Sequence, residues 1–216
     1  MSRAAADALR LYLVVGGLDD DALLAVVDAA LRGGVRCVQL REKTLGTRDF
    51  VARAQRLLPR LRQAGVPLII NDRLDVALAC AADGVHVGQD DMPVDMVRRH
   101  LPRALVGLSV GSLDELDAGQ ALEVDYFSPS PLFATRSKPD AGVPLGLATL
   151  RAMRARCAKP LVPIGGIDAG NAAAVFAAGA DGIAVVSAIV GVDDPCAASS
   201  RLAAIARASA GARHGG

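Results

Sequence analysis

Apolar and polar positions along the chain repeat one pattern: an amphipathic segment rich in Ala, Leu and Arg, a break containing glycine, and a short Val/Ile run. The clearest copies are "ALRGGVRCVQL", "RLRQAGVPLII", "LACAADGVHVG" and "FAAGADGIAVV". Glycine at such a break suits a left-handed helix C-cap, and the β-branched run suits a strand buried on both faces. Each copy therefore predicts a helix that leads into a strand.

Read along the whole chain, this pattern predicts about eight strands and as many helices in alternation. The expected strands are residues 11–15, 35–40, 67–71, 84–87, 105–109, 124–127, 161–165 and 182–186. The expected helices are residues 20–32, 47–64, 73–81, 93–101, 112–121, 147–157, 168–178 and 194–209. Strict alternation indicates parallel strands joined by right-handed crossovers.

Eight strand–helix units that close on themselves make an α/β fold, a single (β/α)8 TIM barrel. We expect one domain over residues 1–216, with frayed ends at about 1–9 and 211–216. The alternative is an open doubly wound sheet, which carries a glycine-rich phosphate turn near its start. No such turn follows the first expected strand, so the barrel is favoured.

Polar residues gather where the expected strands end, which is where barrels of this kind place their active sites. Nearly every strand is followed there by polar side chains or by bare glycine. These positions are Gln39 to Lys43, Asn71 and Asp72, Gln89 to Asp91, Ser109, Thr135 to Lys138, Gly165 and Gly166, and Val186 and Ser187. We therefore expect them to surround one mouth of the barrel.

The residue types at this mouth indicate a site for phosphate groups and a metal. Two or three carboxylates from adjacent strand ends, among Asp72, Asp90 and Asp91, with an amide beside them, form a hard-oxygen set that suits Mg²⁺, which takes one or two protein carboxylates together with substrate phosphate. Positive charge for a polyphosphate comes from Arg41, Lys43 and Lys138. The Gly165-Gly166 and Val186-Ser187 segments offer backbone N–H groups for a second phosphate.

Simpler structural roles remain open for each of these residues taken singly. Asp72 and Asp90 each stand just before an expected helix and could act as its N-cap. Lysines and arginines in loops are commonly solvated surface charges, and a Gly-Gly pair is commonly a tight turn. His86 alternates with Val85 and Val87, which favours a wall or core position over a ligand role. It is the joint occurrence of these residues at one rim that favours a site.

Composition limits the partners of the chain. Lys and Arg number 24 against 23 Asp and Glu, a formal charge of +1, so no net field attracts nucleic acid or an anionic membrane. No apolar run approaches the roughly 20 residues that span a bilayer, and no export signal is visible. The four scattered cysteines suit a reducing compartment. We expect a cytoplasmic protein that acts on small molecules; the sequence is compatible with a homo-oligomer and does not determine the oligomeric state.

Seven motifs together resemble the thiamine phosphate synthase family. They are "QLREK" at 39–43, "NDR" at 71–73, "GVHVGQDD" at 84–91, Ser109 in "GLS", Lys138 in "TRSK", "PIGGI" at 163–167 and "GADGIAVVSAI" at 179–189. The resemblance implies transfer of an aminopyrimidine methyl group from its diphosphate to the ring nitrogen of a thiazole monophosphate, with release of pyrophosphate. In this family the diphosphate leaves first, and the thiazole traps the resulting cation.

The resemblance also implies a role for each residue of these motifs. The residues that would hold the pyrimidine diphosphate are Gln39, Arg41, Lys43, Asn71, Ser109 and Lys138, of which Arg41, Lys43, Ser109 and Lys138 would also act in catalysis. Their motif neighbours Leu40, Glu42 and Arg136 would belong to the substrate site as well. Asp72 and Asp91 would bind the cofactor Mg²⁺. The residues that would hold the thiazole phosphate are Thr135, Ser137, Gly166, Val186 and Ser187.

Two departures from the family pattern concern the thiazole side. Ser128-Pro129-Ser130 stands where the family usually has Gly-Pro, and Ser137 replaces a second threonine. Two other functions remain open: a thiazole tautomerase, a sister enzyme that lacks the metal-binding acids, and a non-catalytic sensor of phosphate ligands. Asp72 and Asp91 argue against the tautomerase. The same two acids together with Lys43 and Lys138 argue against the sensor.

Overall fold

A parallel β-sheet forms the centre of the computed structural model, which describes residues 7–135, 137 and 142–213. Within those residues the sheet has seven strands in the order β6-β5-β4-β3-β2-β1-β7, and every neighbouring pair is parallel. The strands are β1 (Leu11–Val15), β2 (Cys37–Leu40), β3 (Leu68–Asn71), β4 (Gly84–Val87), β5 (Leu105–Val110), β6 (Tyr126–Pro129) and β7 (Ile183–Val185).

The expected strand at 161–165 is present as two isolated bridges, Phe127 with Leu161 and Ile164 with Ala184, which connect β6 to β7 and close the ring. Backbone bonds on both sides support it, since Val162 N–H donates to the Phe127 carbonyl at 2.8 Å and Ala184 N–H donates to the Pro163 carbonyl at 2.9 Å. A continuous ladder does not form because Pro129 and Pro163 have no N–H to donate. The predicted barrel is confirmed. Its closure at residues 161–164, between β6 and β7, is a weaker seam in the sheet.

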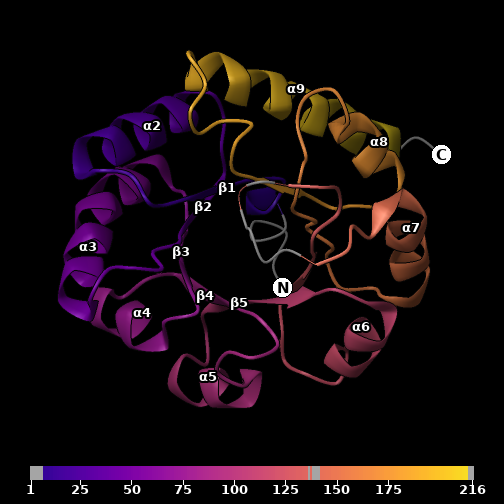
Figure 1. The fold of residues 1–216 in the computed structure, drawn as a ribbon, viewed down its shortest axis with the longest axis horizontal. Helices are drawn as coiled ribbons and strands as arrows, with labels where there is room; N and C mark the ends of the chain where they lie inside the picture. The colour runs from indigo at the N-terminus through magenta and orange to yellow at the C-terminus, as the bar shows by residue number, and fades with distance from the viewer. Residues whose placement is uncertain (1–6, 136, 138–141, 214–216) are drawn as a thin grey trace.

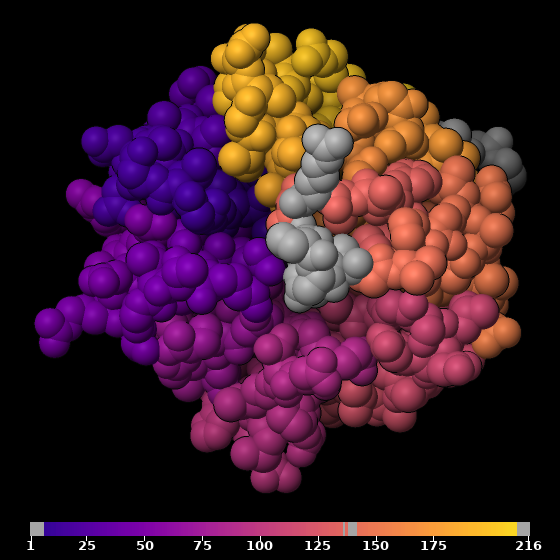
Figure 2. All heavy atoms as spheres, in the orientation of Figure 1, coloured from indigo at the N-terminus to yellow at the C-terminus, as the bar shows by residue number. Residues whose placement is uncertain are grey.

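Helices cover the outside of the ring, as Figure 1 shows. They are α2 (Asp20–Arg32), α3 (Thr47–Ala64), α4 (Leu74–Cys80), α5 (Val94–His100), α6 (Leu113–Gly119), α7 (Gly146–Arg156), α8 (Ala172–Ala177) and α9 (Pro195–Arg213). In Figure 2 the colours pass around the face in sequence order, and the yellow α9 region meets the indigo α2 region. Among the described helices, none has the length and apolar character needed to span a bilayer.

Alternation along each strand divides the buried residues into two layers. Side chains such as Leu11, Leu13 and Val15 face outward and pack in the large core between sheet and helices. The side chains between them face the barrel axis, where Tyr12 and Val14 belong to a smaller separate cluster. The inward positions nearest the C-terminal ends of the strands are therefore available for a site.

One of the four helix-to-strand joints differs from its prediction. In "LACAADGVHVG" the left-handed residue after α4 is Ala81, with φ of 51°, and no glycine caps the helix. Gly84 instead lies inside β4, where a Cβ atom would stand 2.2 Å from the Leu105 carbonyl oxygen of the next strand. This glycine serves close packing of two strands and not helix termination.

Candidate active site

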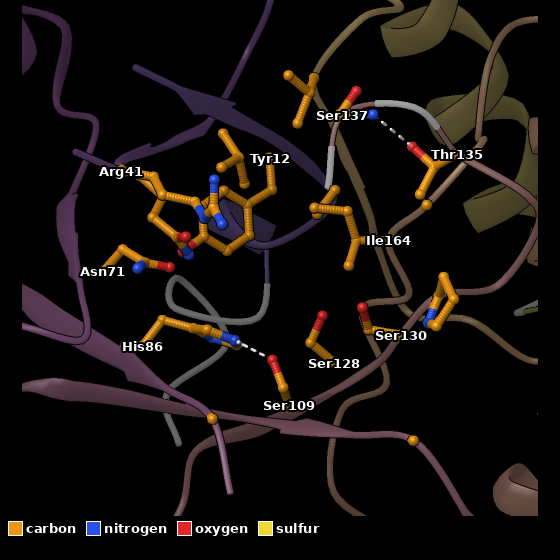
Figure 3. Close-up of a pocket in the computed structure, with 18 of the residues that line it drawn as sticks. Tyr12, Arg41, Asn71, His86, Ser109, Ser128, Ser130, Thr135, Ser137 and Ile164 are labelled. Atoms are coloured by element: carbon orange, nitrogen blue, oxygen red, sulfur yellow. Dashed lines mark hydrogen bonds between the residues drawn. The ribbon is translucent and has the colours of Figure 1, made fainter. Parts of the chain in front are cut away.

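A pocket of about 600 Å³ opens at the C-terminal ends of the strands, within the size range of small-molecule sites. Figure 3 shows its side chains arriving from opposite sides, with Arg41 and Asn71 facing Ile164 and Thr135 across the opening. The expected site residues that line it are Gln39, Arg41, Lys43, Asn71, Asp72, Asp91, Ser109, Thr135, Ser137, Gly166, Val186 and Ser187. The fold thus brings together residues from almost every strand end. Arg136 and Lys138 lie outside the described residues.

Asp72 faces the pocket and does not cap the helix that follows it. Its Oδ2 accepts a hydrogen bond from Lys43 Nζ at 2.5 Å, which joins the ends of β2 and β3. The N-cap position of α4 belongs to Arg73, which makes no side-chain cap bond. Asp72 has φ of 60°, a left-handed conformation that Asp and Asn tolerate better than most residues. The helix-cap interpretation of Asp72 is therefore not supported.

Asp91 is half-buried beside Asp72, and its Oδ2 accepts the Gly88 N–H at 2.7 Å. Burial raises the pKa of Asp91, and the neighbouring Asp72 carboxyl raises that pKa further. A carboxyl whose ionisation is opposed by burial and by a neighbouring carboxyl is one that a cation would stabilise. Helix α5 has Pro93 as its N-cap, so neither Asp91 nor Asp90 caps it.

The possible metal ligands at this edge of the pocket are the carboxylates of Asp72 and Asp91, with the amide of Asn71 next to them. Among the described residues, no group of three or more His, Cys, Asp and Glu is placed to hold a metal ion. Mg²⁺ does not need such a cage, because it retains waters and binds one or two carboxylates together with phosphate oxygens. Asp72 and Asp91 therefore fit Mg²⁺ better than zinc, which takes three or four protein ligands.

The opposite edge of the pocket is built from backbone. Gly165 and Gly166 have φ of 106° and 62°, and a Cβ at Gly166 would stand 2.5 Å from the Ala134 carbonyl oxygen. The chain after β6 lies directly on this segment, where Phe133 N–H donates to the Gly165 carbonyl at 3.0 Å. Only glycine combines this conformation with such close contact. The same contact brings Thr135 to the pocket beside Gly166.

Backbone N–H groups at this edge are left for a ligand. Within the described part of the chain, the N–H groups of Gly166 and Ser187 have no hydrogen-bond acceptor. Helix α8 begins at Ala172, and not at the expected residue 168, because a turn held by Asp168 and Asn171 comes first. With only six residues, α8 adds no helix-terminus effect of its own, so the anion-binding capacity rests on the loop amides.

The floor of the pocket is a buried chain of hydrogen bonds that crosses the barrel. Gln39 Nε2 donates to the Tyr12 hydroxyl at 2.8 Å, and the Tyr12 and Tyr126 hydroxyls lie 3.0 Å apart. Tyr126 contacts His86 Nδ1 at 3.0 Å. His86 Nε2 contacts Ser109 Oγ at 2.8 Å, the bond marked between these two residues in Figure 3. Burial lowers the pKa of His86 to about 4, although Asp91 opposes the shift, so the ring is neutral near pH 7.

Two of the expected substrate residues do not line the pocket. Leu40 is fully buried in the outer core. The Glu42 side chain is buried, and its carboxylate accepts hydrogen bonds from Arg53 Nη1 at 2.7 Å and from the Gly17 N–H at 3.3 Å. These contacts place Glu42 in the packing between β2 and α3, because the side chain points away from the axis when Arg41 points into the pocket.

Several pocket residues escape sequence reasoning. Tyr12, which lines the pocket, and Tyr126, which lies beneath it in the hydrogen-bonded floor, read as ordinary core residues, and His86 reads as a wall residue. The signal that could identify them is period two: each lies an even number of positions from an inward-facing strand-end residue. Ser128 and Ser130, at the departure from the family pattern, also line the pocket.

Comparisons with known proteins agree on one family. A family model described as thiamine monophosphate synthase matches residues 11–189. The chain is 54% identical over 201 residues to a thiamine-phosphate synthase of Albidiferax ferrireducens, covering 90% of each chain. It is 52% identical over 181 residues to a thiamine-phosphate synthase of Chloroflexus aurantiacus, covering 84% of each. A solved thiamine phosphate pyrophosphorylase from Pyrococcus furiosus superimposes with a TM-score of 0.86 at 32% identity, covering 95% of this chain and 98% of that one. With its pocket built from the family's own motifs, the chain belongs to the thiamine monophosphate synthase family of enzymes.

Proposed function

We propose that the chain joins 4-amino-2-methyl-5-(diphosphooxymethyl)pyrimidine to a thiazole monophosphate, giving thiamine phosphate and pyrophosphate, with Mg²⁺ as cofactor. The observation that carries the proposal is a single pocket with two different anion-binding edges. One edge has Lys43, Asp72 and Asp91, and the other has the N–H groups of Gly166 and Ser187, which have no acceptor among the described residues. A reaction between one diphosphate and one monophosphate substrate needs both.

The charged edge suits the pyrimidine diphosphate. Arg41 and Lys43 line it from the end of β2, and Asn71 lines it from the end of β3. Asp72 and Asp91 would hold Mg²⁺, which would neutralise charge on the diphosphate when bound. Lys43 already contacts Asp72 at 2.5 Å, so an ammonium group stands next to the proposed metal position. Gln39 and Ser109 are placed between this edge and the floor, where the pyrimidine ring would lie.

The backbone edge suits the thiazole monophosphate. Thr135 and Ser137 add hydroxyl groups to the amides of Gly166, Val186 and Ser187, and all five line the same pocket. Thr135 Oγ1 accepts the Ser137 N–H at 3.2 Å, which shapes this turn (Figure 3). Neutral donors of this kind bind a phosphate that takes no part in bond breaking.

The proposed reaction breaks one bond and forms one. The C–O bond between the pyrimidine methylene carbon and the diphosphate breaks, and its electron pair leaves with the diphosphate. The lone pair of the thiazole nitrogen then forms the new C–N bond to that carbon. No side chain acts as a nucleophile, so the residues of the charged edge contribute by binding and by stabilising negative charge as it develops.

Pyrophosphate release tests the proposal directly. We expect release from the pyrimidine diphosphate to require both the thiazole monophosphate and Mg²⁺, with thiamine phosphate formed in equal amount. A thiazole tautomerase would convert the thiazole phosphate alone and would not need the metal. A sensor would bind both phosphates without any release. Either of the last two results would overturn the proposal.

Location and assembly stay predictions. We infer a cytoplasmic enzyme with small-molecule partners and with no nucleic-acid or membrane partner, and a homo-oligomer agrees with the sequence. Size-exclusion chromatography with light scattering would measure the oligomeric state.

A further inference from the structure

We propose that the buried hydrogen-bond chain beneath the pocket points the Ser109 proton into the pocket, which makes Tyr12, Tyr126 and His86 positioning residues. The inference rests on the proposed function, because it identifies what keeps one of the substrate-binding groups in its donor state. The hydrogen-bond chain runs from Gln39 to Ser109 and crosses the barrel between strands β2 and β5. Figure 3 shows its last bond, between His86 and Ser109.

The direction of the chain follows from counting protons. The amide nitrogen of Gln39 can only donate, so the Tyr12 hydroxyl accepts from it and donates its own proton to Tyr126, a better acceptor than the sulfur of Cys37, which also lies beside Tyr12. The Tyr126 hydroxyl accepts that bond and donates to His86 Nδ1. A neutral imidazole carries one N–H, so with Nδ1 as acceptor the proton is on Nε2.

The last bond decides the state of Ser109. His86 Nε2–H donates to Ser109 Oγ at 2.8 Å. The Ser109 hydroxyl then uses a lone pair toward the floor, and its proton is free to point into the pocket that the side chain lines. Turning the Gln39 amide over would place its oxygen against Tyr12, reverse every bond and turn the Ser109 proton inward. Ser109 would then be an acceptor from the pocket.

Burial prevents water from relaxing this constraint. Gln39 is 4% exposed, Tyr12 1%, Tyr126 0% and His86 7%. A buried polar group left without its partner costs about 1–3 kcal/mol, so all four groups are satisfied only when every bond runs the same way. The chain therefore behaves as one unit and not as four separate contacts.

Gly107, which has no side chain, leaves room for the contact between His86 and Tyr126. Gly107 lies between His86 and Tyr126 in the register of β4, β5 and β6. A Cβ atom at Gly107 would stand 2.2 Å from Tyr126 Cζ and 2.4 Å from His86 Nδ1. The two rings stack across this gap, with centroids 5.6 Å apart and an interplanar angle of 30°. The close approach that glycine permits here is what allows the chain to cross β5.

For the proposed reaction, the Ser109 hydroxyl is an uncharged hydrogen-bond donor whose direction is fixed before substrate binds. A hydroxyl that already points into the pocket can donate to an oxygen of the departing diphosphate without reorienting as charge develops. Ser109 is held on its other side as well, since Gln89 Nε2 donates to the Ser109 carbonyl at 2.7 Å. The hydroxyl direction is thus set by the floor and the backbone position by the rim.

The first test reads the histidine tautomer in the ligand-free protein and needs no activity. The chain has three histidines, so ¹⁵N-histidine NMR near pH 7 gives few signals, and a His86→Gln variant identifies those of His86. We expect a neutral ring with the proton on Nε2, and a mixture of tautomers in Tyr126→Phe. A proton on Nδ1 of His86 in the unsubstituted protein would mean that the hydrogen-bond chain runs in the opposite direction, and it would overturn the proposal.

The second test is a double-mutant cycle on turnover. We expect Ser109→Ala to lower kcat on the order of a hundredfold and Tyr126→Phe about tenfold, with little change in KM. If Tyr126 acts through Ser109, the double variant should be no slower than Ser109→Ala alone. Multiplication of the two effects would mean that Tyr126 acts on its own and would overturn the positioning role.

A matched control separates positioning from general damage to the core. Ser199 is a fully buried hydroxyl in α9, bonded to the Pro195 carbonyl at 2.7 Å and remote from the pocket lining. Ser199→Ala should leave kcat unchanged. If the unsubstituted protein releases no pyrophosphate, the proposed function is wrong. The NMR measurement still decides the direction of the hydrogen-bond chain in that case.

Discussion

The two edges of the pocket bind anions by different means. The edge formed by β2, β3 and β4 uses charged side chains, Lys43, Asp72 and Asp91, which contact one another directly. The edge formed by the 165–166 and 186–187 segments offers backbone N–H groups, with hydroxyls of Thr135 and Ser137 next to them. Among the described residues, charge is concentrated where the proposed bond breaks, and the edge that would only hold a phosphate is built from backbone and hydroxyl groups.

This contrast teaches how the two kinds of site respond to substitution. A side-chain site loses its function when the charge is removed, even if the fold is unaffected. A backbone site is insensitive to side-chain truncation and sensitive to any change that moves the chain. The predictions below separate the two edges by this criterion.

The largest effect is expected for Asp72→Asn. Asn keeps the size of the side chain and tolerates the left-handed backbone at φ of 60°, so the variant should fold normally. Loss of the charge that we propose holds Mg²⁺ should lower turnover on the order of a hundredfold or more, measured as pyrophosphate release. Raising the Mg²⁺ concentration should recover part of the activity.

Two neighbouring aspartates provide the control for this experiment. Asp91→Asn should behave like Asp72→Asn, whereas Asp90→Asn should do far less, because Asp90 is exposed and neither pairs with Lys43 nor affects the pKa of Asp91. Near-normal pyrophosphate release in both Asp72→Asn and Asp91→Asn would remove the metal role from this edge and revive the tautomerase or sensor function.

The next largest effect is expected for Glu42→Gln, a substitution just outside the charged edge. Glu42 is adjacent to Lys43 in sequence, yet its buried carboxylate pairs with Arg53 at 2.7 Å. Glu42→Gln should lower the free energy of unfolding by about 2 kcal/mol, the scale of a hydrogen bond to a charged group. Urea unfolding measures this change. KM for either substrate should stay within about twofold, and a large rise in KM for the pyrimidine diphosphate would return Glu42 to the substrate site.

On the backbone edge, Gly166→Ala should have a moderate effect. The added Cβ meets the Ala134 carbonyl oxygen at 2.5 Å, and φ of 62° strains any L-residue. Strain of about 1–2 kcal/mol should displace the amide and raise KM for the thiazole phosphate about tenfold, with KM for the pyrimidine diphosphate nearly unchanged. Gly46→Ala serves as control, since nothing lies within 4 Å of its Cβ position and its φ is −64°. Equal rises in both KM values would contradict the division into two edges.

The smallest effect is expected for Ser187→Ala. The side chain is exposed, and the group assigned to the phosphate is the backbone N–H, which alanine retains. Steady-state kinetics should show a change in KM for the thiazole phosphate below about threefold, the effect of one exposed hydroxyl. A loss as large as that of Asp72→Asn would mean that this edge, too, depends on a side chain.

The sequence by itself determined the barrel and the charged edge. Alternation of helical and β-branched segments is local chemistry, and the strand bounds it predicted agree closely for 11–15 and 84–87. Asp72, Asp91 and Lys43 could be grouped because strand ends in a parallel barrel must meet at one rim. Residue type then indicated the chemistry, since carboxylate oxygens that meet at one rim are ligands that suit Mg²⁺.

Only the tertiary structure decided what depends on direction and distance. Glu42 and Lys43 are both charged residues of the motif "QLREK", and the sequence assigned both to the substrate site. The structure shows that Glu42 instead packs against Arg53 of α3. His86 and Tyr126 are forty positions apart along the chain, and they meet because Gly107 leaves a gap between them. The seam at 161–164 likewise depends on Pro129 and Pro163, which lack the N–H groups that would continue the ladders on its β6 and β7 sides. Contacts of this kind join segments remote in sequence, and no local pattern of polarity specifies which partner a side chain finds.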